Sequence, residues 1–165
     1  MLNYETVFTD CKIVPLSREL LSVHLEAILT MDAAIIGEAW QREHYLSELP
    51  GKWQYSCLAL RQTTALGFLV ASQKAESLHI HRLAVDNAQQ GRGVGRRLLH
   101  HLAANAATGS TPTITLKVGV ANEKAIEFYR QLGFHQDSES AENLTLSITA
   151  QTLRQNTNIE KPINA

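Results

Sequence analysis

The fold of this chain is decided by residues 79–99, whose sequence is HIHRLAVDNAQQGRGVGRRLL. Alternating bulky residues up to Val85 predict a β-strand over residues 78–85. A glycine-rich turn follows, and from about Val94 apolar residues recur at helical spacing. The stretch therefore predicts a strand, a turn and a helix in direct succession.

A glycine-rich turn that opens a helix is suited to bind a phosphate group. The first backbone N–H groups of a helix have no partner within it, and the helix dipole is positive at this end. Glycine lacks the Cβ atom that would keep an anion away from these groups. Three arginines of the stretch add positive charge: Arg92, Arg96 and Arg97. We interpret the turn as a phosphate cradle, and the alternative is a glycine turn that binds no ligand.

The glycine spacing excludes two common nucleotide-binding motifs. The dinucleotide motif needs G-x-G-x-x-G with an acidic residue about 20 positions further on. This chain has G-x-G-x-G, and residues 110–112 contain no carboxylate. The P-loop motif needs Gly-Lys followed by Ser or Thr, which is also missing.

The segment Gln90-Gly91-Arg92-Gly93-Val94-Gly95, after a strand ending Leu-Ala-Val-Asp, resembles the Gln/Arg-x-x-Gly-x-Gly/Ala signature of the GCN5-related N-acetyltransferase (GNAT) family. Residues 116–134 resemble the later motif of this family, with a strand, Asn122, a helix containing Tyr129, and then Leu-Gly-Phe. The two motifs occur in the family's order and cover residues 78–134. The resemblance implies an acetyl-CoA-dependent N-acetyltransferase, an acyltransferase that needs no covalent enzyme intermediate.

The rest of the chain predicts an α/β fold, an α+β mixed sheet flanked by helices, which is the fold of this family. The predicted order is β-α-α-β-β-β-α-β-α-β, with hairpins in the middle and helices between the later strands. Predicted strands before residue 78 cover residues 12–16, 53–60 and 66–71, and predicted helices cover 17–30 and 40–49. Later predicted strands cover residues 113–120 and 144–148. We predict a single domain over residues 1–153 and a polar C-terminal tail over residues 154–165.

Composition limits the partners of the chain. Of its 165 residues, 44% are hydrophobic and 19% charged, which is typical of a globular domain. Fifteen basic and sixteen acidic side chains give a net charge of -1, so the basic excess of nucleic-acid or membrane-surface binders is missing. The sequence shows two cysteines, no secretory signal and no apolar run of about 18 residues. We expect a cytoplasmic protein; its oligomeric state stays open, a homodimer included.

The family resemblance implies a set of acetyl-CoA contacts. The strand ending at Val85 would splay from the strand at 113–120, and the pantetheine arm would lie along it like an added strand. The pyrophosphate would lie on the glycine turn, and Asn122 would both cap its helix and bond the pantetheine arm. The implied contacts are Leu83, Ala84, Val85, Gln90, Gly91, Arg92, Gly93, Val94, Gly95, Arg96, Asn122 and Tyr129.

Two residues are candidates for proton transfer. Tyr129 is protonated at neutral pH and could give its proton to the departing thiolate, although it would also fit a core position. His79 lies where some family members carry a glutamate base, and Lys117 stands where others carry one. In a regular strand His79 would share a face with Leu83 and Val85, and a bulge would break this register. The alternative for His79 is a half-exposed strand residue; the pair with His81 lacks further ligands, so we expect no metal.

The identity of the acceptor amine stays open between a small molecule and a protein N-terminus. Residues near the first two helices are candidates for its pocket, although an ordinary amphipathic helix would look the same: Glu38, Trp40, Glu43, His44 and Tyr45. A different class of function is a non-catalytic acyl-CoA-binding or regulatory domain that keeps the same glycine turn. A weaker alternative is RNA binding through the arginines of the turn.

Overall fold

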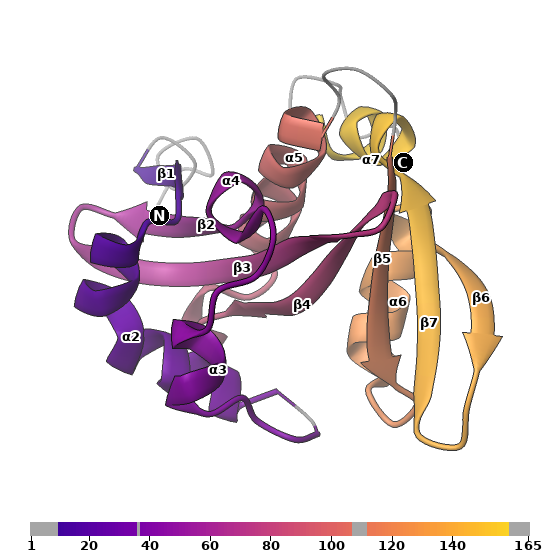
Figure 1. Cartoon of the computed structure of the whole chain (residues 1–165), viewed down its shortest axis with the longest axis horizontal. Helices are drawn as coiled ribbons and strands as arrows, with labels where there is room; N and C mark the ends of the chain where they lie inside the picture. Colours follow the sequence, from indigo (N-terminus) through magenta and orange to yellow (C-terminus); the bar gives the residue numbers. More distant parts are fainter. Residues whose placement is uncertain (1–9, 36, 107–111, 159–165) are drawn as a thin grey trace, which may run out of the picture.

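The computed structural model describes residues 10–35, 37–106 and 112–158. These residues form a seven-stranded sheet with strand order β1-β2-β3-β4-β5-β7-β6 and helices packed on it (Figure 1). Neighbouring strands are antiparallel except β4 and β5, which run parallel. The predicted mixed sheet flanked by helices is confirmed.

The strands are β1 (Cys11–Pro15), β2 (Cys57–Arg61), β3 (Thr64–Lys74), β4 (Ser77–Val85), β5 (Thr113–Gly119), β6 (His135–Glu139) and β7 (Asn143–Thr149). The helices are α2 (Arg18–Ala33), α3 (Arg42–Leu46), α4 (Lys52–Tyr55), α5 (Val94–Ala106), α6 (Glu123–Gln131) and α7 (Ala150–Thr157), with a 3₁₀ turn η1 (Asn87–Gln89). Ser17 caps α2, because its hydroxyl oxygen accepts a hydrogen bond from the Leu20 N–H at 3.1 Å.

Each face of the sheet has its own apolar core. On one face α2 and α3 cover β3, where Phe68 and Val70 point toward Ile28. On the other face α5, α6 and α7 cover the sheet, where Leu69 and Leu116 point toward Leu98. The alternation along β3 places successive side chains in opposite cores, whereas the apolar side chains of β5 all lie in the α5 core. The sheet therefore separates two environments, and a gap between its strands would connect them.

Two predicted elements near residue 50 are wrong in extent. The helix expected over 40–49 is reduced to α3, because the Trp40 N–H is held in a non-helical position by Asp32 Oδ2 at 2.7 Å. The strand expected over 53–60 begins only at Cys57, after the short helix α4. Gly51 turns the chain with φ of +71°, and its carbonyl accepts from the Tyr55 N–H at 3.0 Å. Aromatic alternation in this segment resembled a strand although it forms a helical turn.

The predicted tail is wrong at its start. Residues 154–157 belong to α7, which packs against α5 with Leu153 and Thr157 fully buried. The side chain of Asn156 donates to the Leu132 carbonyl at 2.8 Å and ties the helix to the end of α6. The polar composition of this segment concealed its two buried contacts. Residues 159–165 of the predicted tail lie outside the described residues. None of the helices in the described ranges is long and apolar enough to cross a bilayer.

Candidate active site

The gap in the sheet lies between its two parallel strands. β4 and β5 pair only from Ser77–Thr113 to Ile80–Leu116. Beyond that point β4 continues to Val85, pairs with β3 alone among the described strands, and diverges from β5 (Figure 1). On the β5 side no described strand pairs with residues 82–85. Apart from the Val85 carbonyl, which accepts from Gln90 Nε2 at 3.2 Å, this backbone edge is available to bond an extended ligand.

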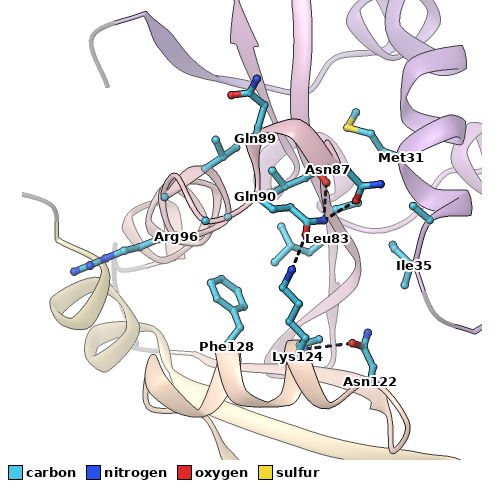
Figure 2. Close-up of a pocket in the computed structure, with 18 of the residues that line it drawn as sticks. Met31, Ile35, Leu83, Asn87, Gln89, Gln90, Arg96, Asn122, Lys124 and Phe128 are labelled. Atoms are coloured by element: carbon cyan, nitrogen blue, oxygen red, sulfur yellow. Dashed lines mark hydrogen bonds between the residues drawn. The ribbon is translucent and has the colours of Figure 1, made fainter. Parts of the chain in front are cut away.

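A cavity of about 400 Å³ lies beside this free edge. Figure 2 shows Lys124 and Phe128 of α6 and its cap Asn122 on one side, and Met31 and Ile35 near the end of α2 on another. The implied contacts that line it are Leu83, Ala84, Val85, Gln90, Gly91, Gly93, Val94, Gly95, Arg96, Asn122 and Tyr129. The structure therefore brings together residues from β4, the glycine turn, α5 and α6.

One implied acetyl-CoA contact, Arg92, and the candidate base, His79, do not line this cavity. Arg92 is exposed on the glycine turn, and His79 points elsewhere. Sequence reasoning missed several lining residues: Met31, Ala34, Ile35, Asn87, Gln89, Lys124, Ala125 and Phe128. Those on α6 precede Tyr129, and Ala125, four residues before it, was open to prediction from helical spacing. Those of α2 had no local signal, because their place in the cavity depends on packing across the sheet.

The glycine turn presents a row of unpaired backbone donors. Among the described residues, no acceptor takes a hydrogen bond from the backbone N–H groups of residues 91–96. Gly91 and Gly93 have φ of +78° and +84°, which is the left-handed region that glycine adopts without strain. A Cβ at Gly95 would lie 3.2 Å from Phe128, so glycine also permits close packing there. These donors at the start of the α5 dipole suit a phosphate or pyrophosphate group.

Side chains around the row are held by specific contacts. Lys124 donates to Gln90 Oε1 at 3.0 Å, and the same amide donates to the Val85 carbonyl at 3.2 Å (Figure 2). Arg96 donates to the Asn156 carbonyl at 3.0 Å, and its buried Nε has no hydrogen-bond partner among the described residues. Lys124 and Arg96 therefore supply positive charge at the cavity.

Arg97 is turned away from this group. Its guanidinium donates to the carbonyl of Cys11 on β1 at 2.7 Å. Of the three arginines that the sequence placed near a phosphate, only Arg96 lines the cavity. The helical periodicity explains the difference, because neighbouring residues at the start of a helix point about 100° apart.

Tyr129 forms part of the cavity wall with only 8% of its surface exposed. Its ring packs between Phe128 and Phe134, with centroids at 5.3 Å from each. Burial raises the pKa of the phenol well above its ordinary value, and the positive charge of Arg82 opposes this only in part. Its hydroxyl bonds no described residue, so a protonated donor is available to a ligand. Asn122 holds the start of this helix, since Oδ1 accepts from the Ala125 N–H at 3.2 Å.

A bulge in β4 changes the prediction for His79. The pairing with β3 shifts by one residue, because Ala71 is opposite Ile80 while Val70 is opposite Arg82. His81 is the extra residue, and the alternation of side chains reverses after it. Leu83 and Val85 therefore pack toward the α5 core, whereas His79 lies on the opposite face. The bulge therefore breaks the shared face that a regular strand would have given.

His79 is a half-buried, neutral imidazole. Its Nδ1 lies 2.9 Å from Thr115 Oγ1, and its ring centroid lies 4.9 Å from that of His81. Burial lowers its pKa to about 4, with further lowering by the charges of His81, Lys74 and Lys117. The imidazole is therefore unprotonated at neutral pH and can accept a hydrogen bond. Its role as a base stays a prediction.

A buried ion pair stands beside the gap on the α2 face. Asp32 is fully buried, and Oδ1 accepts from Arg82 Nε at 2.5 Å while Oδ2 holds the Trp40 N–H. Tyr45 is also fully buried; burial first, and then the charge of Asp32, raise the pKa of its hydroxyl. Sequence reasoning missed this pair, since its members are 50 positions apart. The one available signal was a carboxylate on the apolar face of α2.

The candidate acceptor residues are only partly brought together. The Trp40 ring packs against His44, Tyr45 and His81, with centroid distances between 5.2 and 5.6 Å. Because Tyr45 is fully buried, it supports the wall rather than contacting a ligand. Glu38 and Glu43 are exposed, and neither forms an ion pair with a described residue.

Comparison with known proteins agrees with this geometry. A model of the Acetyltransferase (GNAT) family matches residues 25–134. The chain is 42% identical over 57 residues to the N-alpha-acetyltransferase RimI of Mycobacterium tuberculosis, which is 34% of either protein. It is 35% identical over 69 residues to the ribosomal protein bS18-alanine N-acetyltransferase of Salmonella typhimurium, 42% of this chain and 47% of that one. The chain spans less than half the length of these curated relatives.

Solved structures share the fold. Arabidopsis thaliana Naa50, in complex with a bisubstrate analogue, has a TM-score of 0.69 at 18% identity over 84% of this chain and 98% of that chain. The ribosomal-protein-S18-alanine N-acetyltransferase of Escherichia coli has a TM-score of 0.70 at 19% identity over 85% and 94% of the two chains. A PaiA N-acetyltransferase from Thermoplasma acidophilum, solved with coenzyme A, has a TM-score of 0.64 at 18% identity over 84% and 98%.

Proposed function

The chain belongs to the acetyltransferase (GNAT) family, and on this basis we propose that it transfers the acetyl group of acetyl-CoA to a primary amine. One observation carries the proposal. The unpaired N–H groups of residues 91–96, the free edge of β4 and the buried phenol of Tyr129 border one cavity. An anion cradle, a strand edge and a proton donor are the three features that a phosphopantetheine thioester requires.

The described residues fit acetyl-CoA, which supplies an activated acetyl thioester. The N–H groups of residues 91–96 would hold the pyrophosphate, with Arg96 and Lys124 neutralising its charge. The free edge of residues 83–85 would bond the pantetheine amides, and Asn122 would bond the same arm. Residues on β4 would thereby orient the thioester toward Tyr129 at the far end of the cavity.

The reaction requires a neutral amine and a protonated leaving group. The amine nitrogen forms the new C–N bond, the C–S bond breaks, and the sulfur receives a proton. Tyr129 would donate that proton, because burial keeps its phenol protonated at neutral pH. The amine proton would leave toward the His79 side of the gap, where a neutral imidazole can accept a hydrogen bond. A backbone N–H near residues 83–85 would stabilise the developing oxyanion.

For the acceptor we propose the α-amino group of a protein N-terminus, with a small-molecule amine as the alternative. The support comes from the relatives, since one is an N-alpha-acetyltransferase and another modifies an alanine of a ribosomal protein. We further propose that the protein acts in the cytoplasm, where its free thiols at Cys11 and Cys57 would remain reduced.

The test is acetyl transfer by the purified chain. Protein and acetyl-CoA are mixed with N-terminal peptides and with small amines; free thiol and acetylated product are then measured. We expect amine-dependent thiol release, and a fall in kcat of about 100-fold in Tyr129→Phe. Tyr55→Phe, which removes a hydroxyl away from this cavity, is the matched control. Tight binding of coenzyme A without transfer to any amine would instead indicate a non-catalytic acyl-CoA-binding domain.

A further inference from the structure

The sheet carries a basic face beside the gap, which we call the acceptor face. It consists of exposed Lys74 and Lys117, half-buried His79 and Thr115, and buried Ser72. Resting on the proposed function, we propose that this face selects an amine that carries an anionic group, a carboxylate or a phosphate. Lys117 is the principal contact and Lys74 the secondary one. The preferred acceptors are thereby narrowed to anionic amines, and polyamines or lysine-flanked N-termini are disfavoured.

The strand register places these side chains on one face. His79 on β4 is opposite Ser72 on β3 and Thr115 on β5. Lys74 and Lys117 follow their strand neighbours by two residues, which in a β-strand returns the side chain to the same face. The 2.9 Å contact between His79 and Thr115 supports this arrangement. The two lysines therefore flank the imidazole from different strands.

Lys117 stands where a ligand would enter the gap from this side. It follows Leu116, the last residue of β5 that pairs with β4. Leu116 and Val118 point into the α5 core, so Lys117 points to the other face, where it is exposed. Thr145, its partner on β7, is uncharged and half-buried. An acceptor approaching the thioester from the α2 side would therefore pass this ammonium group.

The positive charge of the acceptor face is not balanced within the described residues. Neither Lys74 nor Lys117 forms an ion pair there. Asp32 of α2 is committed to Arg82 and to the Trp40 N–H. On β6, Asp137 is 3.3 Å from His135, at the far edge of the sheet. Within the face itself the charged side chains are the two lysines. Glu76 of the β3–β4 turn and Glu38 and Glu43 on the α2 side are exposed carboxylates outside it, and none forms an ion pair with a described residue.

In addition to burial, the positive charge of this face lowers the pKa values of His79 and His81. Burial is the largest cause that lowers the pKa of His79, followed by His81, Lys74 and Lys117. The pKa of His81 is lowered by burial, then by Lys74 and by Lys52 of α4. No carboxylate contributes to either shift. A bound ammonium would experience the same repulsion, so the field favours the neutral amine that attack requires, provided that an anion elsewhere on the acceptor secures binding.

The experiment compares three peptides that differ only at the second residue, which is Asp, Asn or Lys. With saturating acetyl-CoA, the aspartate peptide is expected to have a KM about three- to fivefold below the asparagine peptide, and the lysine peptide a higher one. In Lys117→Glu the order of the aspartate and lysine peptides should reverse. Lys12→Glu makes the same charge change at an exposed lysine of the edge strand β1. It should leave the order of the KM values for the aspartate and lysine peptides unchanged.

A second set of acceptors determines whether the anionic group belongs to a peptide or to a small molecule. Small amines with and without a carboxylate or phosphate are compared with the peptides, so a preference confined to either set identifies the source. Equal KM values for all charges, or an unchanged order in Lys117→Glu, would overturn the inference while acetyl transfer itself persists. If no amine of any charge releases thiol, the proposed function fails, and the inference fails with it.

Discussion

The two sides of the gap between β4 and β5 are built in different ways. The α5 side carries the glycine turn and α6, and its contacts come from residues 83–96 and 122–129. The α2 side carries Asp32, Trp40, His79 and Lys117, which reach one place from four separate segments. The first side presents mainly backbone donors, whereas the second presents mainly side chains.

This difference has a functional consequence. A backbone cradle depends on chain conformation, so many side chains around it can vary while the same cosubstrate is held. A surface of side chains depends on which residues tertiary packing brings together, so each substitution there changes the charge that an acceptor meets. One fold can therefore keep acetyl-CoA chemistry constant and vary its acceptor. The predictions below test this division, from the largest expected effect to the smallest.

The buried ion pair should be the most sensitive point of the α2 side. Asp32→Ala leaves the Arg82 guanidinium without its carboxylate and frees the Trp40 N–H, and we expect a loss of about 3–5 kcal/mol in unfolding free energy. Urea denaturation measures it. Glu48→Ala breaks the exposed pair with Arg18 and should lower the unfolding free energy far less, because solvent screens that pair. Equal losses in the two variants would show that the buried pair does not hold this side together.

In the backbone cradle, substitution of Gly91 should lower both stability and coenzyme A affinity. An added Cβ there meets no atom within 4 Å, so Gly91→Ala tests the left-handed backbone alone, with φ of +78°. We expect a cost of about 1–2 kcal/mol for that conformation, and coenzyme A affinity lower by about tenfold. Calorimetry with coenzyme A measures the affinity. Gly119→Ala, where the new atom would be 3.8 Å from the nearest carbonyl and φ is not positive, should bind normally.

The same division explains what the sequence could predict. The glycine turn and the Asn122 cap are local features, and the structure contains both of them. The family resemblance extended these to the diverging strands and to Tyr129 in the cavity wall. Neighbouring residues in the chain determine such features, so a short segment is enough to identify them.

Other features depend on contacts that no short segment contains. At His81 the pairing of β4 with β3 shifts by one residue. The resulting bulge reverses which β4 side chains lie on the α5 side of the sheet. The Asp32–Arg82 pair joins α2 to β4 across the sheet. The helix α7 forms because Leu153 finds a buried site against α5. The acceptor side was therefore predicted less completely than the cofactor side.

On the α2 side, loss of the contact between Thr115 and His79 should have a moderate effect on kcat. Thr115 Oγ1 is 3.5 Å from the Leu78 carbonyl, so its hydroxyl can donate there while it accepts from His79 Nδ1 at 2.9 Å. This arrangement leaves Nε2 of His79 as the acceptor. Thr115→Val should lower kcat several-fold with little change in KM, and Thr115→Ser should restore it. Thr113→Val, on the same face without such a contact, is the control; an equal loss there would contradict the role of the hydroxyl.

The titration of His79 should have the smallest effect, which is a change in unfolding free energy with pH. Burial holds its pKa at about 4, whereas an unfolded histidine titrates near pH 6.5. Between these values the unfolded chain binds the proton and the folded chain does not, so unfolding free energy falls as the pH falls from about 6.5 toward 4. Partial exposure to solvent reduces the size of this term. His79→Gln should flatten that part of the stability curve in urea denaturation at a series of pH values.

The same shift predicts how turnover responds to pH. Because His79 is already neutral above about pH 5, its removal should lower kcat by a constant factor from about pH 6 to pH 8. Removal of the positive charge of Lys117 by Lys117→Gln should raise the pKa of His79 and of a bound amine, and shift the acidic limb of the rate profile upward. A loss of kcat in His79→Gln that grows toward acidic pH would show an imidazole titrating near its ordinary value. In that case the acceptor side would not carry the positive field that separates it from the backbone cradle.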